Sequence, residues 1–331
     1  MKNEPGNNGV FVISLDLELL WGIWDVASKD GAYGENIKAV KKVIPALLSL
    51  FEQYSIKATF ATVGFLFAKN KTELSASLPS QKPKYSNPGY NVYLKEINSV
   101  GIDETDDPFH FGFSLLQLLK NSCHEIGTHT HSHYYCLENG QTAEDFEADL
   151  LAAKKIATAN NIKLESFVFP RNQVNENYLQ ILYNNGIKAY RGNPTSWIYK
   201  PRRFAAEILF IRLCRLIDAY LPVSGMNGHS LTSQKNKPVN IAASRFMKPW
   251  FMPLSWLEPL RLYRIKQEMT NAAKNKKLYH LWWHPHNFGK NLDKNIKNLS
   301  ILLNHYQQLN KKYGFTCCSM QEAALLIATK K

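Results

Sequence analysis

The sequence contains no apolar run long enough to cross a membrane. A spanning helix needs about 20 predominantly apolar residues, and no segment reaches that length without charges. The short apolar run near the N-terminus, in "MKNEPGNNGVFVISLDLELLWG", is interrupted by Asp16 and Glu18, which is not the pattern of a signal peptide. These absences predict a cytoplasmic protein, not an exported or membrane-spanning one.

Cysteine is scarce and poorly placed for cross-linking. The five cysteines form no C-x-x-C pair, and an odd number cannot all pair with one another: Cys123, Cys136, Cys214, Cys317 and Cys318. Two of them are adjacent within an apolar run. The pattern predicts reduced, buried thiols in a cytosolic setting and not a disulfide framework.

Glycine-rich dinucleotide-binding loops and internal repeats are also missing. Instead, apolar strand-like segments alternate with helix-like segments along the 331 residues. Such alternation implies parallel strands with helical crossovers, and without a dinucleotide loop it favours a closed barrel over an open sheet. The sequence therefore predicts an α/β fold, a (β/α) barrel of about seven parallel strands, as a single domain over residues 1–331. The strands are expected within 10–18, 56–65, 123–131, 165–170, 187–192, 277–285 and 315–319.

Two stretches interrupt this alternation and are interpreted as insertions on the barrel rim. Residues 69–108 are polar, whereas residues 196–276 are basic and rich in aromatic side chains. The second stretch holds fourteen Lys or Arg and four Asp or Glu, a net +10 within a total of +13. A positive patch of this size indicates an anionic partner.

Within the basic insertion, "PRRFAAEILFIRLCRLIDAYLP" has helical periodicity and is expected to begin at Pro201. One side of this helix is apolar, and Arg203, Arg212 and Arg215 lie on the other. Two interpretations remain open: a cap packed on the barrel, or an element that contacts an anionic membrane surface through residues 200–266. No nucleic-acid-binding motif is present, and an aromatic, amphipathic patch suits a membrane better than a nucleic acid.

Histidine is concentrated in one segment, "CHEIGTHTHSHYY". Four of the ten histidines of the chain lie there, and His129 and His133 are four residues apart. That spacing can aim two imidazoles at one point, and two histidines with one carboxylate leave open positions on a zinc-like ion. Asp16 and Glu18 supply carboxylates at the end of an apolar strand, where a buried acid needs a partner such as a metal.

Other polar residues also follow predicted strands, namely Arg171, His284 and His286. Because active sites of such barrels lie at the carboxyl ends of the strands, we expect these residues to converge with the histidine segment.

Three motifs, "SLDLE", "HEIGTHTHSH" and "LWWH", resemble those of polysaccharide deacetylases, the NodB-homology or carbohydrate esterase family 4 group. The resemblance runs from Ser14 to His284. It implies a distorted (β/α) barrel that uses a divalent metal, most often zinc with cobalt or nickel as alternatives, to hydrolyse N-acetyl groups on sugars. It also implies that His129 and His133 are metal ligands and that Asp16 is the general base. The usual second, adjacent Asp is replaced by Leu17, so Glu18 is expected as the third ligand.

The remaining roles follow from the same resemblance. His284 keeps the family's Leu-x-x-His form and is expected to protonate the leaving amine, with His286 as the alternative. Arg171 is expected to pair with Asp16, but the family's Tyr is absent after it, so Asn172 or Gln173 is expected to replace the oxyanion donor. Trp197 is a candidate for the sugar site or the core. His124 and His131 are expected to support the site structurally.

These inferences converge on a metal-dependent hydrolase that removes an N-acetyl group from an amino sugar. The predicted substrate is a lipid-linked or nucleotide-linked precursor of surface polysaccharide, met in the cytoplasm or at the inner face of the membrane. Two alternatives stay open at this stage: hydrolysis of a carbon–nitrogen bond in a small non-sugar amide, and a non-catalytic protein that binds carbohydrate or a membrane surface.

Overall fold

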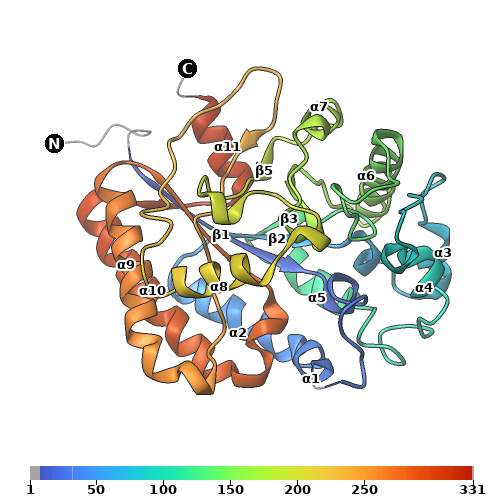
Figure 1. Cartoon of the computed structure of the whole chain (residues 1–331), viewed down its shortest axis with the longest axis horizontal. Coiled ribbons are helices and arrows are strands. Elements are labelled where there is room, and N and C mark those ends of the chain that lie inside the picture. Colours follow the sequence, from blue (N-terminus) through green and yellow to red (C-terminus); the bar gives the residue numbers. More distant parts are fainter. Residues whose placement is uncertain (1–7, 32, 330–331) are drawn as a thin grey trace.

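The protein folds around one curled sheet of parallel strands with helices on its outside, as a computed structural model of residues 8–31 and 33–329 shows (Figure 1). The order of the strands is β6-β5-β4-β3-β2-β1-β8-β7, with β9 paired to β1. The predicted α/β barrel class is thus confirmed. The strands are β1 (Val10–Leu17), β2 (Ala58–Thr62), β3 (Glu125–Thr128), β4 (Ser166–Val168), β5 (Ala189–Arg191), β6 (Val239–Asn240), β7 (Arg245–Phe246), β8 (Leu278–Trp283) and β9 (Thr316–Cys317).

All seven expected strands are present, and β6 and β7 are two short additions within the stretch interpreted as the basic insertion. One continuous segment, 239–247, joins the two edges of the sheet. Its Ile241 and Ala243 N–H groups donate to β5 and the residue after it, and its Ser244 and Met247 N–H groups donate to β8. The segment therefore completes the wall of the barrel, which two-residue strands are too short to reveal in the sequence.

Helices alternate with the strands as the parallel topology requires. They are α1 (Gly34–Lys38), α2 (Val40–Gln53), α3 (Lys71–Ala76), α4 (Val92–Lys95), α5 (Phe113–Lys120), α6 (Ala143–Ala159), α7 (Leu179–Asn184), α8 (Leu209–Asp218), α9 (Glu258–Lys274), α10 (Leu292–Tyr313) and α11 (Met320–Ala328). Figure 1 shows α9 and α10 side by side along one flank of the barrel. No helix in the described part of the chain is both apolar and long enough to span a bilayer.

Local sequence explains the elements that carry the site. Every residue of β1 is buried, as expected for a central parallel strand with a continuous apolar sequence. Thr142 and Asp145 form a capping box that starts α6, which fixes the helix beside the histidine segment.

The helix expected to begin at Pro201 begins at Leu209 instead. The guanidinium of Arg202 donates to the carbonyls of Trp197, Ile198 and Lys200, which holds this stretch as a loop. A short 3₁₀ turn, Phe204–Ala206, then precedes α8. Because the Arg202 side chain donates to these backbone carbonyls, they do not need helical hydrogen bonds.

Candidate active site

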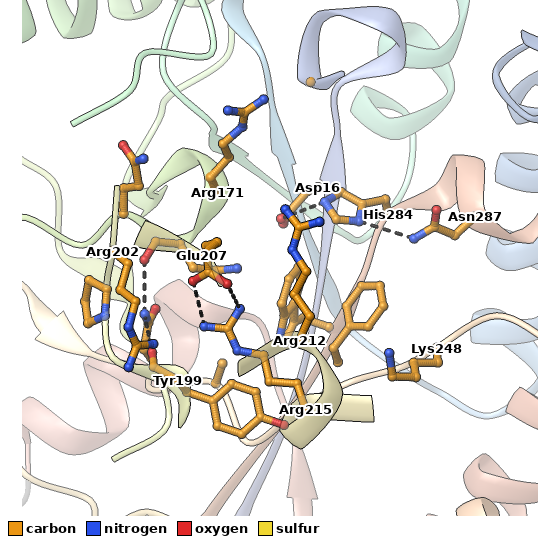
Figure 2. A pocket seen from close by; sticks show the side chains of 18 of the residues that line it. Asp16, Arg171, Tyr199, Arg202, Glu207, Arg212, Arg215, Lys248, His284 and Asn287 are labelled. Carbon is orange, nitrogen blue, oxygen red and sulfur yellow. Dashed lines mark hydrogen bonds and ion pairs between the residues drawn. The ribbon is translucent and has the colours of Figure 1, made fainter. Parts of the chain in front are cut away.

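One pocket of about 510 Å³ opens at the carboxyl ends of the barrel strands and gathers most of the predicted site residues (Figure 2). Asp16, near the end of β1, and Glu18, just beyond it, both line the pocket and are both buried. His133 and His284 line the same pocket. Two acids spaced two residues apart on a strand point to the same side, which is why both reach one cavity.

His129 and His133 converge on Glu18. The Nε2 atom of each histidine lies 3.3 Å from Glu18 Oε2. Thr130 and His133 adopt left-handed backbone conformations, with φ of 63° and 57°. These two kinks fold the segment after β3 so that histidines four residues apart face one carboxylate, and such strain is characteristic of functional sites.

A buried aspartate from α6 holds this histidine loop in place. Asp149 accepts hydrogen bonds from the backbone N–H of His131 at 2.6 Å and of Ser132 at 3.2 Å, and from the Ser132 hydroxyl. Burial raises the pKa of Asp149 to about 6 despite these donors. Sequence reasoning missed this support, although an acid on the helix after a histidine motif could have suggested it.

The donor atoms of Glu18, His129 and His133 fit a divalent metal. The Nδ1–H of His129 donates to the Val168 carbonyl at 2.9 Å, which leaves the lone pair of Nε2 directed at Glu18. Two neutral imidazoles and one carboxylate are a zinc-type set with open positions. All three side chains are buried, and their ligand atoms lie within 4.8 Å of one another. A cation would relieve the buried carboxylate and use both lone pairs.

Glu18 also faces a second pair of histidines. Its Oε1 atom lies 3.6 Å from His284 Nε2 and 4.0 Å from His286 Nε2, and the two rings stack at 5.1 Å. Burial raises the pKa of Glu18, but the neighbouring imidazoles, His284 first and then His129 and His133, outweigh it and hold the pKa well below its usual range. Glu18 therefore stays ionised between the two pairs.

Asp16 is held by Arg191, which sequence reasoning did not single out. Two parallel hydrogen bonds, 2.6 and 2.7 Å long, join this guanidinium from β5 to the carboxylate, and both side chains are buried. Burial raises the pKa of Asp16, but Arg191, together with His129 and His284, more than offsets it, so the pKa is lowered. The guanidinium also lies 4.0 Å from the ring centroid of Trp282.

The prediction that Arg171 pairs with Asp16 is wrong. Arg171 forms two 2.6 Å hydrogen bonds to Asp25 and stacks on Tyr135, at the edge of the pocket. Its backbone is left-handed, with φ of 53°, which turns the side chain away from Asp16. Asp25 thus takes the place that the sequence interpretation gave to Asp16.

Of the two expected substrate-binding residues, one lines the pocket and the other does not. Asn172 lines the pocket, and its side-chain oxygen accepts from Arg191 at 3.2 Å. The backbone N–H groups of Asn172 and Gln173 already donate to Phe169 and Pro170, so neither is free as the expected oxyanion donor. Trp197 is outside the pocket lining and is 49 % exposed, so it belongs neither to this cavity nor to the core.

His284 is better placed than His286 to exchange a proton with a ligand. Its side chain is 24 % exposed, and Nε2 lies 3.7 Å from Asp16. Asn287 accepts from the Tyr33 hydroxyl and donates to Nδ1 of His284, which leaves the ring proton on Nε2, facing the carboxylates. His286 is buried, and burial, followed by the neighbouring His284, lowers its pKa to about 3.

The comparison with protein families agrees with this geometry. Residues 30–190 match the family profile described as polysaccharide deacetylase. Over this range, just under half of the chain, the protein is similar to polysaccharide deacetylases. The matched range contains His129 and His133, whereas Asp16, Glu18 and His284 lie outside it. That family consists of metal-dependent hydrolases of carbon–nitrogen bonds, and Glu18, His129 and His133 form a candidate metal group in this chain.

Solved structures share the fold of this chain. One is assigned as a polysaccharide deacetylase from Mycobacterium smegmatis, with a TM-score of 0.63 at 11 % sequence identity. The alignment covers 100 % of this chain and 93 % of that protein. A second, assigned as a polysaccharide deacetylase from Pseudomonas aeruginosa PAO1, has a TM-score of 0.57 at 9 % sequence identity. The alignment covers 99 % of this chain and 93 % of that protein. The PuuE allantoinase has a TM-score of 0.56 at 10 % sequence identity, and the alignment covers 99 % of this chain and 93 % of that protein. No curated protein matches the chain by sequence.

His131 lies within the histidine loop, whereas His124 precedes β3 at the amino ends of the strands, away from the site. His124 Nδ1 accepts from the Ala58 N–H at 3.2 Å, and burial lowers its pKa to about 4. His131 Nε2 lies 3.2 Å from the Ser77 hydroxyl, and burial lowers its pKa to about 3. Both are neutral imidazoles at neutral pH, and neither lines the pocket.

Gly22 provides the space that the Glu18 side chain occupies. A Cβ atom at position 22 would stand 1.9 Å from the Glu18 carboxyl carbon. Gly22→Ala is therefore expected to displace this carboxylate and to weaken zinc binding about 10- to 100-fold, as lost support of a ligand does. Zinc titration by competition with a chromophoric chelator measures the change.

Gly31→Ala is the matched control, because Gly31 lies on the same segment and a Cβ there meets only the Ser28 carbonyl, at 3.3 Å. Its zinc affinity is expected to equal that of the wild type. Equal affinity in Gly22→Ala would show that the Glu18 carboxylate is not needed for the metal.

Proposed function

We propose that this protein is a metal-dependent hydrolase that removes an N-acetyl group from an amino sugar. Its substrate is a phosphate-bearing precursor of surface polysaccharide, linked to a lipid or to a nucleotide. One observation carries the proposal: Glu18 and His133 of the candidate metal group, Asp16 of the Asp16–Arg191 pair and His284 all line a single pocket. Metal ligands, a base and an acid therefore stand within reach of one bound acetamide.

Glu18, His129 and His133 would hold the metal, most often zinc with cobalt or nickel as alternatives. When bound, such an ion supplies Lewis-acid chemistry that polarises an acyl carbonyl and acidifies water. Asp16 accepts the proton of the attacking water, and Arg191 keeps that carboxylate oriented and ionised. As the carbon–nitrogen bond breaks, His284 donates its Nε2 proton to the leaving nitrogen.

The outer part of the pocket is suited to an anionic sugar. Arg202, Arg212 and Lys248 line it, and none of them has a carboxylate partner among the described residues. Trp282 and Phe246 line the same cavity and offer aromatic faces to a sugar ring. These features favour a sugar phosphate over a small neutral amide.

We place this activity in the cytoplasm, at the inner face of the membrane. All five cysteines are free, which suits a reducing compartment. Only Cys136 and Cys318 are buried, however, so the expectation of buried thiols holds for two of the five.

Metal content and acetate release test the proposed function. The wild type is expected to hold about one zinc, cobalt or nickel ion per chain and to release acetate from N-acetylated sugar phosphates. His129→Ala with His133→Ala should lose both, because two of three protein ligands are gone. His124→Ala with His131→Ala is the histidine-matched control and should keep the metal. A metal-free wild type after dialysis against zinc would instead favour a non-catalytic binding protein.

A further inference from the structure

Helix α8 presents its apolar face to solvent. Five large apolar side chains are exposed by 38 to 81 %: Leu209, Phe210, Leu213, Leu216 and Ile217. The other side of the helix packs on the protein through Ile211 and the buried carboxylate of Asp218. The amphipathic pattern is thus inverted relative to a helix that caps a core, where the apolar face is covered. An apolar face of this size needs a partner.

A second group of exposed apolar side chains lies on a segment linked to α8. The 3₁₀ segment Met252–Leu257 and the residue before it expose Phe251 by 57 %, Met252 by 72 % and Trp256 by 74 %. The helix that follows this segment is tied to α8, because Arg264 of α9 donates to Asp218 at 2.9 Å. We name these eight residues the apolar platform: Leu209, Phe210, Leu213, Leu216, Ile217, Phe251, Met252 and Trp256. Most exposed large apolar side chains of the described residues fall between 197 and 263.

The same helix forms a wall of the active-site pocket. Arg212 and Arg215 of α8 line the pocket, as Figure 2 shows, while the platform residues of α8 are exposed. Arg215 is paired with Glu207 by two 2.9 Å hydrogen bonds, but Arg212 has no acidic partner among the described residues. One ten-residue helix therefore carries an apolar surface on one side and a free pocket cation on another.

We propose that the apolar platform docks on an anionic lipid bilayer and that the pocket receives an amino sugar joined to a lipid through phosphate. The choice of substrate rests on the proposed deacetylase function, whereas the docking does not. With α8 at the interface, a phosphate at the lipid surface meets Arg212 and Lys248 while the sugar enters the pocket. Aromatic and aliphatic side chains next to Arg and Lys are the composition of interfacial membrane-binding elements.

Charge distinguishes the bilayer from a second copy of the chain. The stretch that holds the platform carries a net +10, so two copies meeting through it would bring like charges together. Anionic headgroups instead neutralise the flanking Arg and Lys residues. A nucleotide-linked sugar would use the pocket cations but would leave the apolar platform uncovered.

Vesicle flotation tests the docking with the full chain. Wild-type protein is expected to float with vesicles of phosphatidylcholine and phosphatidylglycerol, to float less with phosphatidylcholine alone, and to be released by high salt. Leu209→Asp with Leu213→Asp should reduce the bound fraction about tenfold or more, because two buried apolar contacts are lost. Leu118→Asp with Leu151→Asp is the matched control, since these leucines are 44 and 49 % exposed on α5 and α6.

The docking is overturned if the wild type stays unbound to anionic vesicles or if the α8 variant floats as the wild type does. Dimers that dissociate in Leu209→Asp with Leu213→Asp, without vesicle binding, would identify a second copy as the partner instead. The His129→Ala and His133→Ala variant should float normally, so failure of the metal site and failure of docking give different results.

Acetate release separates the two sources of phosphate. A polyprenyl-phosphate-linked N-acetyl sugar in anionic vesicles is expected to be deacetylated about tenfold more slowly by the α8 variant than by the wild type. Faster release from a nucleoside-diphosphate-linked sugar, unchanged by the α8 variant, would overturn the lipid-linked substrate. Release from neither sugar, with flotation intact, would refute the deacetylase function and leave the docking standing.

Discussion

Asp16→Asn is expected to lower the rate of acetate release by about 10²- to 10⁴-fold, the usual contribution of a general base. The amide keeps the shape of the side chain but cannot accept the proton of the attacking water. Because Glu18, His129 and His133 are unchanged, the metal content should remain at the wild-type level. Acetate release and metal analysis on the same preparation measure both quantities.

Asp25→Asn is the matched control for this substitution. Asp25 also accepts two hydrogen bonds from an arginine, Arg171, at the edge of the same pocket. It belongs to neither candidate metal group, so its loss should leave the rate of acetate release within a few-fold of the wild type. Equal rates for Asp16→Asn and the wild type would refute the role of Asp16 as the base.

Arg191→Met should lower the free energy of unfolding by about 3–5 kcal/mol, the cost of removing one partner of a buried ion pair. Methionine fills much of the same space without a charge, so the Asp16 carboxylate would lose its two hydrogen bonds in a fully buried position. The hydrogen bonds to Ser14 and Asn172 would be lost as well. Urea unfolding followed by circular dichroism measures the loss.

The double variant Asp16→Asn with Arg191→Met separates stability from catalysis. It removes the buried negative charge together with its partner, so most of the stability should return, as it does when a buried pair is replaced by neutral groups. Acetate release should stay as low as in Asp16→Asn alone. A double variant no more stable than Arg191→Met would mean that the buried charge of Asp16 is not the source of the instability.

Much of the fold could be predicted from the sequence because its elements are encoded locally. The continuous apolar stretch of β1 and the capping box of α6 each depend on residues close in the chain. The convergence of Asp16, Glu18 and the histidine segment could also be predicted from the sequence, because parallel strands place their carboxyl ends on the same rim of the barrel. β6 and β7 could not be predicted, since two residues carry too little periodicity.

The arginine that pairs with Asp16 could not be predicted from the local sequence. Arg171 follows β4 and Arg191 ends β5, so each arginine was equally compatible with a position near β1. Which of the two arginines pairs with Asp16 depends on backbone direction and on distances between segments that are far apart in the chain. The left-handed turn at Arg171 directs it to Asp25, and Arg191 points to Asp16 instead. A family motif describes residue order, but it does not describe which guanidinium reaches which acid.

Sequence alone determined the alternation of strands and helices, the residue types of the candidate metal group and the amphipathic character of the helix near residue 210. Only the tertiary structure decided that Gly22 makes room for Glu18, that Asp149 holds the histidine loop and that the apolar side of α8 faces outward. The physical reason is the same in each case. Periodicity reports that a helix has two unlike faces, but which face is covered depends on what packs against it.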